Sequence, residues 1–351
     1  MSRINQKNLS MEVTAKEKKL VLSVMKKYDF EVHNIIKARS AYKLETDKGS
    51  ICLKRMKHGK NKAHNGNLLV KELNHNNFYN TSKYICTKEG LLFVNINKLV
   101  FYVTEWINGY ECDLGSITEA ENCSKLLAEF HIATNKINTK GFDIKNNLKN
   151  WPEIFNGNLN DLERFKSVIQ RKKLKSEFDL KYLSHIESFY NTGRSLIGLL
   201  DASDYYKLSK AAMENKTICH DSFYYQNIIK AEEKYYIIDL DSIIIDLQIN
   251  DLGKFIRRLM YKTEYQWNFD KALLIINAYN SVYKLSKNEY EVMIALIMFP
   301  HKFWKLGKKR YEKYKNWNEA KYLHKLDRLI NYHEPQQKFL KEYVAYVDKL
   351  F

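Results

Sequence analysis

One short polar segment constrains this chain more than any other part of its sequence. His220 is followed by Asn227, two short strands are predicted after the asparagine, and Asp239 follows the second of them. An amide oxygen and a carboxylate are hard oxygen ligands of the kind that Mg²⁺ prefers in proteins. Asn227 and Asp239 are therefore predicted metal ligands, with the alternative that the loop over residues 218–241 only organises the fold.

The residues before this segment predict a helix followed by a small antiparallel sheet. Thr14 and Glu17 have the spacing of a capping box, which marks the start of a helix. A hairpin is predicted over residues 42–54, because two strand-like runs flank a turn that contains Gly49. The further elements predicted up to residue 134 are helices over 67–77 and 118–134 and strands over 90–95 and 98–105. After residue 134 the chain is predicted to be mostly helical, with β structure only near residues 218–240.

A lysine on an upstream strand usually neutralises the phosphates in ATP-dependent phosphoryl transfer. Lys54 ends the predicted strand 51–54 and fits this place, although a surface lysine at the end of a strand is the simpler alternative. His220 is predicted to be a buried histidine bonded to the backbone of the loop. Asp241 is predicted to cap the following turn rather than to bind a metal.

Taken in order along the chain, these pieces resemble the protein-kinase-like fold in its aminoglycoside-phosphotransferase and choline-kinase branch, and more narrowly the CotS family of spore coat proteins. The segments that carry the resemblance are 49–54, 105–109, 127–131, 220–227, 238–242, 251–257 and 299–304. The resemblance covers about residues 15–345. It implies an α+β fold with two lobes: a small lobe with an antiparallel sheet over residues 1–107, and a larger, mainly helical lobe over 108–351 with the catalytic-like loop 218–241. ATP and Mg²⁺ are the cofactors that it implies.

The chain departs from the phosphotransferase pattern at the catalytic position. That pattern is His-Gly-Asp-x-x-x-x-Asn, and counting back from Asn227 puts Ser222 at the place of the catalytic aspartate and Asp221 at the place of the glycine. A serine hydroxyl is a very poor base at neutral pH, and loss of a positioned base costs about 10²–10⁴ in rate. Either the chain is a pseudo-enzyme, or the loop is shifted by one residue and Asp221 is the base.

A second departure lies where a phosphate-binding loop is expected. The stretch 37–42 has no glycine, so backbone amides approach a phosphate less closely there. Arg39 and Ser40 are the predicted phosphate contacts instead. Glu72 is the candidate partner of Lys54 on the predicted helix 67–77, because it is the only glutamate in that helix.

The charge and composition of the chain exclude some partners and leave others open. The 351 residues include 58 Lys and Arg against 41 Asp and Glu, which gives a net charge of +17 and a third hypothesis, a polyanion-binding protein. Basic and aromatic residues alternate over 303–322, but this spacing is typical of an amphipathic helix, and no nucleic-acid motif is present, so nucleic acid is not expected. No run of about 18 apolar residues occurs, so no membrane span is expected.

The first functional hypothesis is a structural or catalytically impaired spore coat protein on a kinase-like scaffold, a pseudokinase. The alternative is an active ATP- and Mg²⁺-dependent phosphotransferase acting on the hydroxyl of a small molecule or sugar. The family resemblance implies other spore coat proteins as partners. It also implies synthesis in the mother-cell cytoplasm, followed by deposition on the spore coat.

Overall fold

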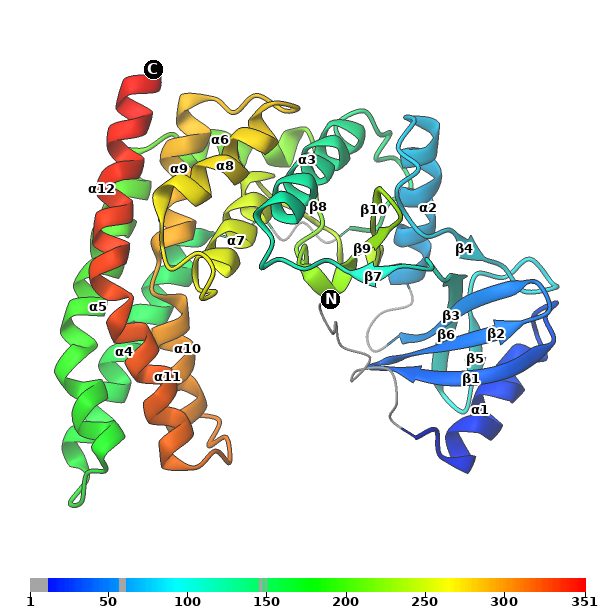
Figure 1. Cartoon of the computed structure of the whole chain (residues 1–351), viewed down its shortest axis with the longest axis horizontal. Coiled ribbons are helices and arrows are strands. Elements are labelled where there is room, and N and C mark those ends of the chain that lie inside the picture. Colours follow the sequence, from blue (N-terminus) through cyan, green and yellow to red (C-terminus); the bar gives the residue numbers. More distant parts are fainter. Residues whose placement is uncertain (1–11, 57–60, 145–147, 149) are drawn as a thin grey trace. The chain divides into compact units, whose positions relative to one another are not determined.

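The computed structural model describes residues 12–56, 61–144, 148 and 150–351, and Figure 1 shows its helices and strands. The chain forms two compact units that interleave in sequence. The sheet unit comprises Met1–Asp113, Glu129–Lys145 and His220–Ile244, and the helical unit comprises Leu114–Ala128, Asn146–Cys219 and Ile245–Phe351. The lobe boundary expected between residues 107 and 108 stays a prediction.

The sheet unit begins with a helix and a β-sheet whose strands all pair antiparallel. The elements are α1 (Ala15–Met25), β1 (Val32–Ala38), β2 (Ala41–Thr46), β3 (Gly49–Met56), α2 (Asn61–His75), β4 (Tyr84–Ile85), β5 (Val94–Ile96) and β6 (Leu99–Glu105). The strand order is β1-β2-β3-β6-β4, and β5 pairs with β6. The predicted hairpin over 42–54 is confirmed, and its turn contains Gly49 at φ 102°.

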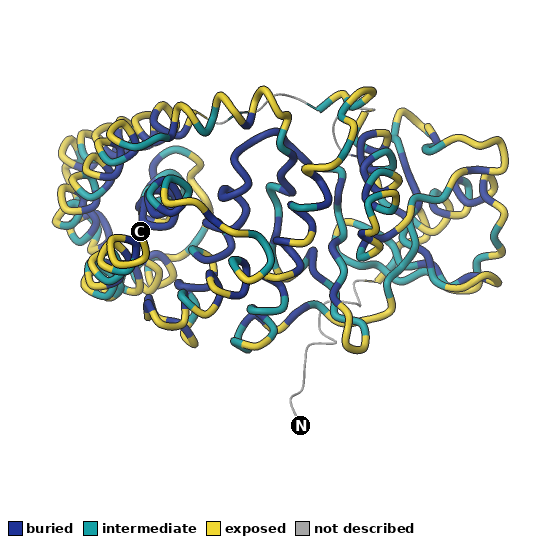
Figure 2. Tube along the Cα trace, turned by 90° about the horizontal axis from the view of Figure 1, so that it is seen from above, coloured by how far each residue is buried: buried dark blue, intermediate teal, exposed yellow. Residues whose placement is uncertain are grey.

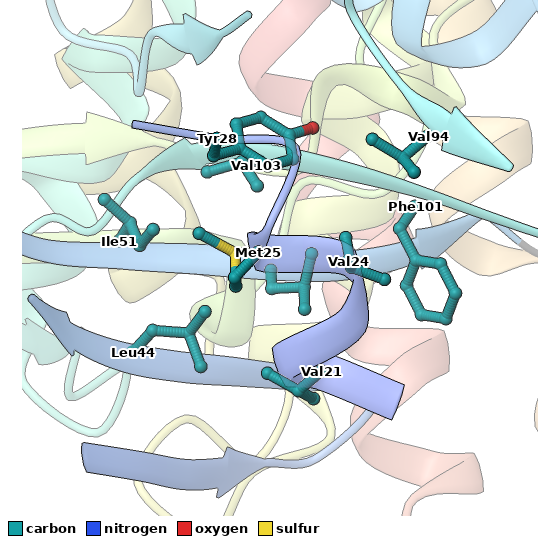
Figure 3. Close-up of a cluster of buried hydrophobic side chains, with 10 residues drawn as sticks. Val21, Val24, Met25, Tyr28, Leu44, Ile51, Val94, Phe101 and Val103 are labelled. Carbon is teal, nitrogen blue, oxygen red and sulfur yellow. The ribbon is translucent and has the colours of Figure 1, made fainter. Parts of the chain in front are cut away.

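Helix α1 packs its apolar face on this sheet. The capping box is confirmed: the Thr14 hydroxyl accepts a hydrogen bond from the Glu17 amide at 3.2 Å, and the Glu17 carboxylate accepts one from the Thr14 amide at 3.0 Å. Figure 3 shows the buried side chains between helix and sheet: Val21, Val24, Met25, Tyr28, Leu44, Ile51, Val94, Phe101 and Val103. This core fixes β3, the strand that carries Lys54.

Helix α2 begins six residues earlier than the sequence predicts. Its first turns contain polar residues that show no apolar period, so the predicted helix began at residue 67. The side-chain amide of Asn65 donates to the backbone oxygen of Asp143 at 2.7 Å, and the Asp143 amide donates back to Asn65 at 3.0 Å. A partner far along the chain therefore stabilises turns that local periodicity does not mark.

A second, three-stranded sheet of the same unit holds the predicted loop. Its strands are β7 (Tyr110–Glu111), β9 (Ile228–Ala231) and β10 (Lys234–Ile237), in the order β10-β9-β7. The short 3₁₀ helices η2 (Tyr225–Asn227) and η3 (Leu240–Ser242) stand at the two ends of this hairpin. The hairpin therefore brings the end of η2 close to the start of η3.

The remaining elements are mostly helices, and Figure 2 shows buried and exposed residues alternating along them. They are α3 (Ile117–Thr134), which contributes residues to both units, α4 (Trp151–Arg171), α5 (Glu177–Ala202), α6 (Tyr205–Glu214), β8 (Ile218–Cys219), β11 (Ile244–Ile245), α7 (Ile249–Met260), α8 (Phe269–Asn280), α9 (Lys287–Met298), α10 (His301–Tyr311), α11 (Glu319–Asn331) and α12 (His333–Leu350). The predicted fold class, an antiparallel sheet region followed by a helical region, is confirmed.

The basic and aromatic stretch over 303–322 is not the single amphipathic helix that the sequence predicts: α10 ends at Tyr311, residues 312–318 are not helical, and α11 begins at Glu319. Phe303, Tyr311 and Tyr322 are buried, and the Phe303 ring stacks on Tyr182 with 4.2 Å between the ring centroids. These three rings therefore belong to the core of the helical unit, whereas Tyr314 in the same stretch is 79% exposed. Among the residues that the structure describes, no helix is long and apolar enough to cross a membrane.

Candidate functional site

Lys54 lies beside two carboxylates at the start of η3. Its ammonium forms an ion pair with Asp239 and lies 3.6 Å from the Asp241 carboxylate. The side chains of Lys54, Asp239 and Asp241 are 21%, 29% and 11% exposed, so all three charges lie in a partly desolvated place. Asp239 has a left-handed backbone, with φ at 69°, which turns the chain from β10 into η3.

Two carboxylates share one ammonium here, and their pKa values move in opposite directions. Burial, together with the neighbouring Asp241, raises the pKa of Asp239 in spite of the Lys54 charge. Burial also acts to raise the pKa of Asp241, but the Lys54 charge and the hydrogen bonds to Asp241 outweigh it, so the pKa of Asp241 is lowered. The pKa of Lys54 is raised, because the two carboxylates outweigh its desolvation. Asp241 is therefore the carboxylate that holds its negative charge most firmly.

Tyr102 positions Asp241. It lies directly opposite Lys54 in the register of β3 and β6, and its hydroxyl donates to Asp241 at 3.0 Å. The Asp241 carboxylate also accepts a hydrogen bond from the Ser242 hydroxyl at 3.1 Å. The prediction that Asp241 caps the following turn was wrong: its oxygens contact Tyr102, Ser242 and Lys54, and no backbone amide of the described residues donates to them.

A glycine of α2, Gly66, packs against an aromatic pair beside this site. The ring of Tyr84 stacks on Tyr102 at 5.5 Å, and a Cβ atom added to Gly66 would meet the Tyr84 hydroxyl oxygen at 2.0 Å. Gly66 therefore makes room for the aromatic pair that supports Asp241. Lys54 forms no ion pair with Glu72 in the described structure, and a role of Glu72 in nucleotide binding stays a prediction.

We expect Gly66→Ala to destabilise the protein by about 1–3 kcal/mol, because the added methyl group meets the half-buried Tyr84, whose ring is held against Tyr102. The measurement is urea denaturation followed by circular dichroism. Gly157→Ala on α4 is the matched control, since nothing lies within 4 Å of its added Cβ and alanine favours a helix by up to about 1 kcal/mol. Equal stability changes in the two variants would contradict the close contact at Gly66.

A backbone hydrogen bond brings Asn227 close in space to Asp239. The amide of Ile238, the residue before Asp239, donates to the Asn227 carbonyl at 3.0 Å. The side-chain nitrogen of Asn227 donates to the Ser222 carbonyl at 3.0 Å, which assigns the orientation of the amide. The amide oxygen of Asn227 is therefore the atom that remains as a ligand of the kind Mg²⁺ takes.

His220 holds this loop together from inside the sheet unit. The side chain is fully buried, Nδ1 accepts from the Ser222 amide at 3.2 Å, and Nε2 lies 3.0 Å from the Ile238 carbonyl. With Nδ1 accepting, Nε2 is the ring nitrogen that donates to the Ile238 carbonyl. The prediction of a buried structural histidine is confirmed.

Asp221 and Ser222 differ in backbone conformation. Asp221 lies in the left-handed region, with φ at 61°, and both side chains are half-buried. Left-handed backbone is readily adopted by glycine and strains most other residues. Asp221, which counting back from Asn227 puts at the place of the pattern's glycine, therefore has a backbone conformation that glycine adopts readily.

The glycine-free stretch 37–42 forms a two-residue turn between β1 and β2. Arg39 has φ at 56°, and Ala38 pairs with Ala41 across the turn. The Arg39 guanidinium forms two contacts with the Glu111 carboxylate of β7, at 2.7 and 2.9 Å, while Ser40 is exposed. A bidentate partner of this kind was not predicted, and it competes with phosphate for Arg39.

The donor set at Asp239, Asp241 and Asn227 fits a hard divalent ion. Two carboxylates face a single ammonium, so a cation added there meets net negative charge, and all the donors are oxygens. Among the described residues no group of three or more His, Cys, Asp or Glu side chains is arranged to hold a metal by itself. Such a donor set suits Mg²⁺, which takes one or two carboxylates together with phosphate oxygens.

Solved structures share this fold. An aminoglycoside phosphotransferase from Alicyclobacillus acidocaldarius matches with a TM-score of 0.84 at 19% identity, covering 99% of this chain and 100% of its own. A spectinomycin phosphotransferase in complex with ADP and spectinomycin matches with a TM-score of 0.60 at 14% identity, covering 92% of this chain and 98% of its own. The chain therefore has the fold of the kinase-like phosphotransferases, as the sequence predicted.

Sequence comparison narrows this class to one family. The model of the family described as spore coat putative kinase YutH matches residues 22–343, so the chain belongs to that family. Spore coat protein S of Bacillus subtilis (strain 168) is 25% identical over 256 residues, which is 72% of each chain. The predicted resemblance to spore coat proteins with a kinase-like fold is confirmed.

Proposed function

We propose that this protein is a spore coat component whose sheet unit binds ATP with Mg²⁺ and whose phosphoryl transfer is impaired. Membership of a spore coat family supports the first part. The grouping of Lys54, Asp239 and Asp241 supports the second, as does the ADP complex of a protein with the same fold. The left-handed backbone of Asp221 supports the third.

Each residue of the proposed nucleotide site has its own role. Lys54 donates to phosphate oxygens and exchanges part of its contact with the carboxylates for them. Asp239 and the amide oxygen of Asn227 hold the metal ion, which neutralises the charge of the phosphates. Asp241, fixed by Tyr102, keeps Lys54 oriented when Asp239 is engaged. Arg39 and Ser40 reach phosphate once Arg39 leaves Glu111, and Glu72 is a further candidate in this site.

The impairment follows from the register of the loop. Because Asp221 has the backbone conformation that suits glycine, Ser222 takes the place of the catalytic aspartate. The Ser222 hydroxyl cannot accept a proton from an attacking hydroxyl group at neutral pH, so the positioned base is absent. Binding of the nucleotide does not need that base, and a protein of this kind is a nucleotide-binding scaffold.

The alternative is an active phosphotransferase that acts on a small hydroxyl-bearing substrate. The grouping of Lys54 with Asp239 favours it, because this pair is retained although the catalytic position is changed. In that case Asp221 is the base. We expect Asp221→Asn to leave the slow release of γ-phosphate from bound ATP unchanged. A rate that collapses in this variant would support the active enzyme instead.

The test of the proposal is a calorimetric titration of the full chain with ATP in the presence of Mg²⁺. We expect saturable binding below millimolar ATP, since the charged groups are already assembled. No heat of binding at millimolar ATP would overturn the nucleotide-binding part and leave a purely structural coat protein.

The proposal also covers the cellular location of the protein and its binding partners. We propose synthesis in the mother-cell cytoplasm, followed by assembly with other coat proteins on the spore surface, as the family membership suggests. A fluorescent fusion followed through sporulation is expected to move from the mother cell to a ring around the spore. A fusion that stays diffuse would contradict this.

A further inference from the structure

A group of cations in the helical unit meets around one tyrosine. Lys302 on α10 places its ammonium 3.6 Å from the centre of the Tyr261 ring, and Arg328 on α11 donates to the Tyr261 carbonyl. The Tyr261 hydroxyl accepts a hydrogen bond from Gln336 at 3.0 Å, so the ring is held from its far end. Tyr261 is therefore held in place, and cations from two helices contact it.

Arg257 on α7 completes this cationic cluster, which we define as Arg257, Lys302 and Arg328. Its guanidinium donates to the Leu296 carbonyl at 2.9 Å, which uses one of its five N–H groups. Lys302 and Arg328 are exposed and Arg257 is half-buried, so solvent reaches all three side chains. Arg257 lies one helical turn before Tyr261, so α7, α10 and α11 each bring a cation to the neighbourhood of this residue.

The cationic cluster has no acidic partner. Among the described residues, no carboxylate lies within 4.0 Å of the charged nitrogens of Arg257, Lys302 or Arg328. The contrast within α10 is clear, because Lys308 lies 3.4 Å from Glu312 and Arg310 lies 2.7 Å from Glu319. Cations further along α10 therefore have acidic partners, whereas the described residues provide none for Lys302.

The electrostatic consequence is a strong local positive potential. Partial desolvation of the ammonium, which lies on the Tyr261 ring, and the charges of Arg328, Arg257, Lys325 and Arg258 lower the pKa of Lys302. Burial and the charges of Arg257, Lys305, Lys254 and Lys302 lower the pKa of His301 to about 3. Glu264 is the acidic residue whose pKa the Arg328 charge helps to lower, after a backbone hydrogen bond that has the larger effect. Repulsion between unpaired cations costs stability, and an anion bound among them relieves it.

We propose that Arg257, Lys302 and Arg328 form a binding site for a phosphate-bearing small molecule. Two planar guanidinium groups and an ammonium match the oxygens of a phosphate dianion. The compact arrangement around Tyr261 favours a small anion over an extended nucleic acid, because the Tyr261 ring is buried and its face is covered by Lys302. This site lies in the helical unit and is independent of the proposed ATP site in the sheet unit.

The first test uses the wild-type full chain and labelling of individual lysines with an amine-reactive acylating reagent at pH 7.5, read by mass spectrometry. Lys302 is expected to react, because its side chain is exposed and accessible to the reagent. Adding inorganic phosphate is expected to reduce its labelling several-fold relative to chloride at equal ionic strength, since a bound anion shields the amine and favours its protonated form. Lys338, which is 76% exposed, is the internal control and should not change.

Glycerol 3-phosphate is the second probe, and it separates an organic phosphate from free phosphate as the ligand. Protection of Lys302 at a lower concentration of glycerol 3-phosphate than of phosphate indicates that the organic part is also recognised. Equal protection indicates a site for the phosphate group alone. Labelling of Lys302 that is the same in chloride and in both phosphates would overturn the proposal.

The second test is the variant Lys302→Met, which removes one repelling charge and keeps most of the stem. We expect a higher melting temperature than wild type without phosphate, and a smaller rise on adding phosphate. Lys338→Met, on α12, is the matched control and should show the wild-type rise. A Lys302→Met protein that is less stable than wild type and that phosphate stabilises equally would contradict the site.

Discussion

Ser222→Asp is expected to raise the rate of γ-phosphate release from ATP bound to this protein by about 10²–10⁴-fold, the range that a positioned base contributes. The substitution places a carboxylate one residue after the left-handed Asp221, where the loop geometry already exists. His220 and Asn227 fix that loop through hydrogen bonds to the amide and carbonyl of Ser222, which the substitution leaves in place. The gain therefore needs no rebuilding of the loop.

The measurement is a single-turnover assay with ATP labelled on the γ-phosphate and protein in excess. Ser222→Asn is the matched control, since its side chain has nearly the size of aspartate and accepts no proton at neutral pH. We expect the Ser222→Asn rate to equal the wild-type rate. An equal gain in both variants would mean that side-chain size, and not a proton acceptor, limits the reaction.

Lys54→Met is expected to lower the free energy of unfolding by about 3 kcal/mol, the scale for removing one partner of a buried ion pair. The variant leaves Asp239 and Asp241 close together in a partly desolvated place with their shared ammonium removed. Methionine fills nearly the same volume, so the loss reports the charge and not a cavity. Urea denaturation at pH 7 measures it.

Asp239→Asn is expected to behave in the opposite way. Because folding raises the pKa of Asp239, the folded state prefers its protonated form, and the free energy of unfolding falls as the pH rises through that range. Asparagine is neutral at every pH and leaves Lys54 paired with Asp241. We therefore expect the variant to be at least as stable as wild type at pH 7, with an advantage that shrinks towards pH 4. A variant as unstable as Lys54→Met would contradict the assignment of Asp241 as the firmly charged partner.

Much of the fold could be predicted because its signals are local. The Thr14–Glu17 capping box and the hairpin around Gly49 follow from neighbouring residues, and both are present. The early start of α2 could not be predicted, because hydrogen bonds between Asn65 and the distant Asp143 support it. The same limit applies to the bidentate contact between Arg39 and Glu111, since β7 is only two residues long.

The sequence predicted the site residues that lie close together along the chain, but not the residue that reaches the site from a neighbouring strand. The spacing of Asn227 and Asp239 pointed to a shared place, and the backbone contact of Ile238 with Asn227 now supports it. Tyr102 was missed, although the register that sets it opposite Lys54 would have pointed to it. Asp241 was predicted to cap a turn. Its position two residues after Asp239 does not indicate which of the two aspartates contacts Lys54, and both do.

The cationic cluster could not be predicted from the composition of the chain. A net charge of +17 suggests polyanions in general, but it does not distinguish Lys308 and Arg310, which pair with Glu312 and Glu319, from cations that have no acidic partner. Lys302 and Arg328 contact Tyr261, and Arg257 lies one helical turn before it; in the described part of the chain no carboxylate pairs with these three cations, which only the packing of three helices reveals.

The most direct test of the account is the Mg²⁺ dependence of ATP affinity, measured by calorimetry on the wild-type chain and on Asp239→Asn. If Asp239 and Asn227 hold the metal against the phosphates, wild type binds ATP more tightly with Mg²⁺ than with EDTA, and Asp239→Asn loses that difference while remaining folded. An ATP affinity that is the same with Mg²⁺ and EDTA, or a Mg²⁺ effect that survives in Asp239→Asn, would contradict the account.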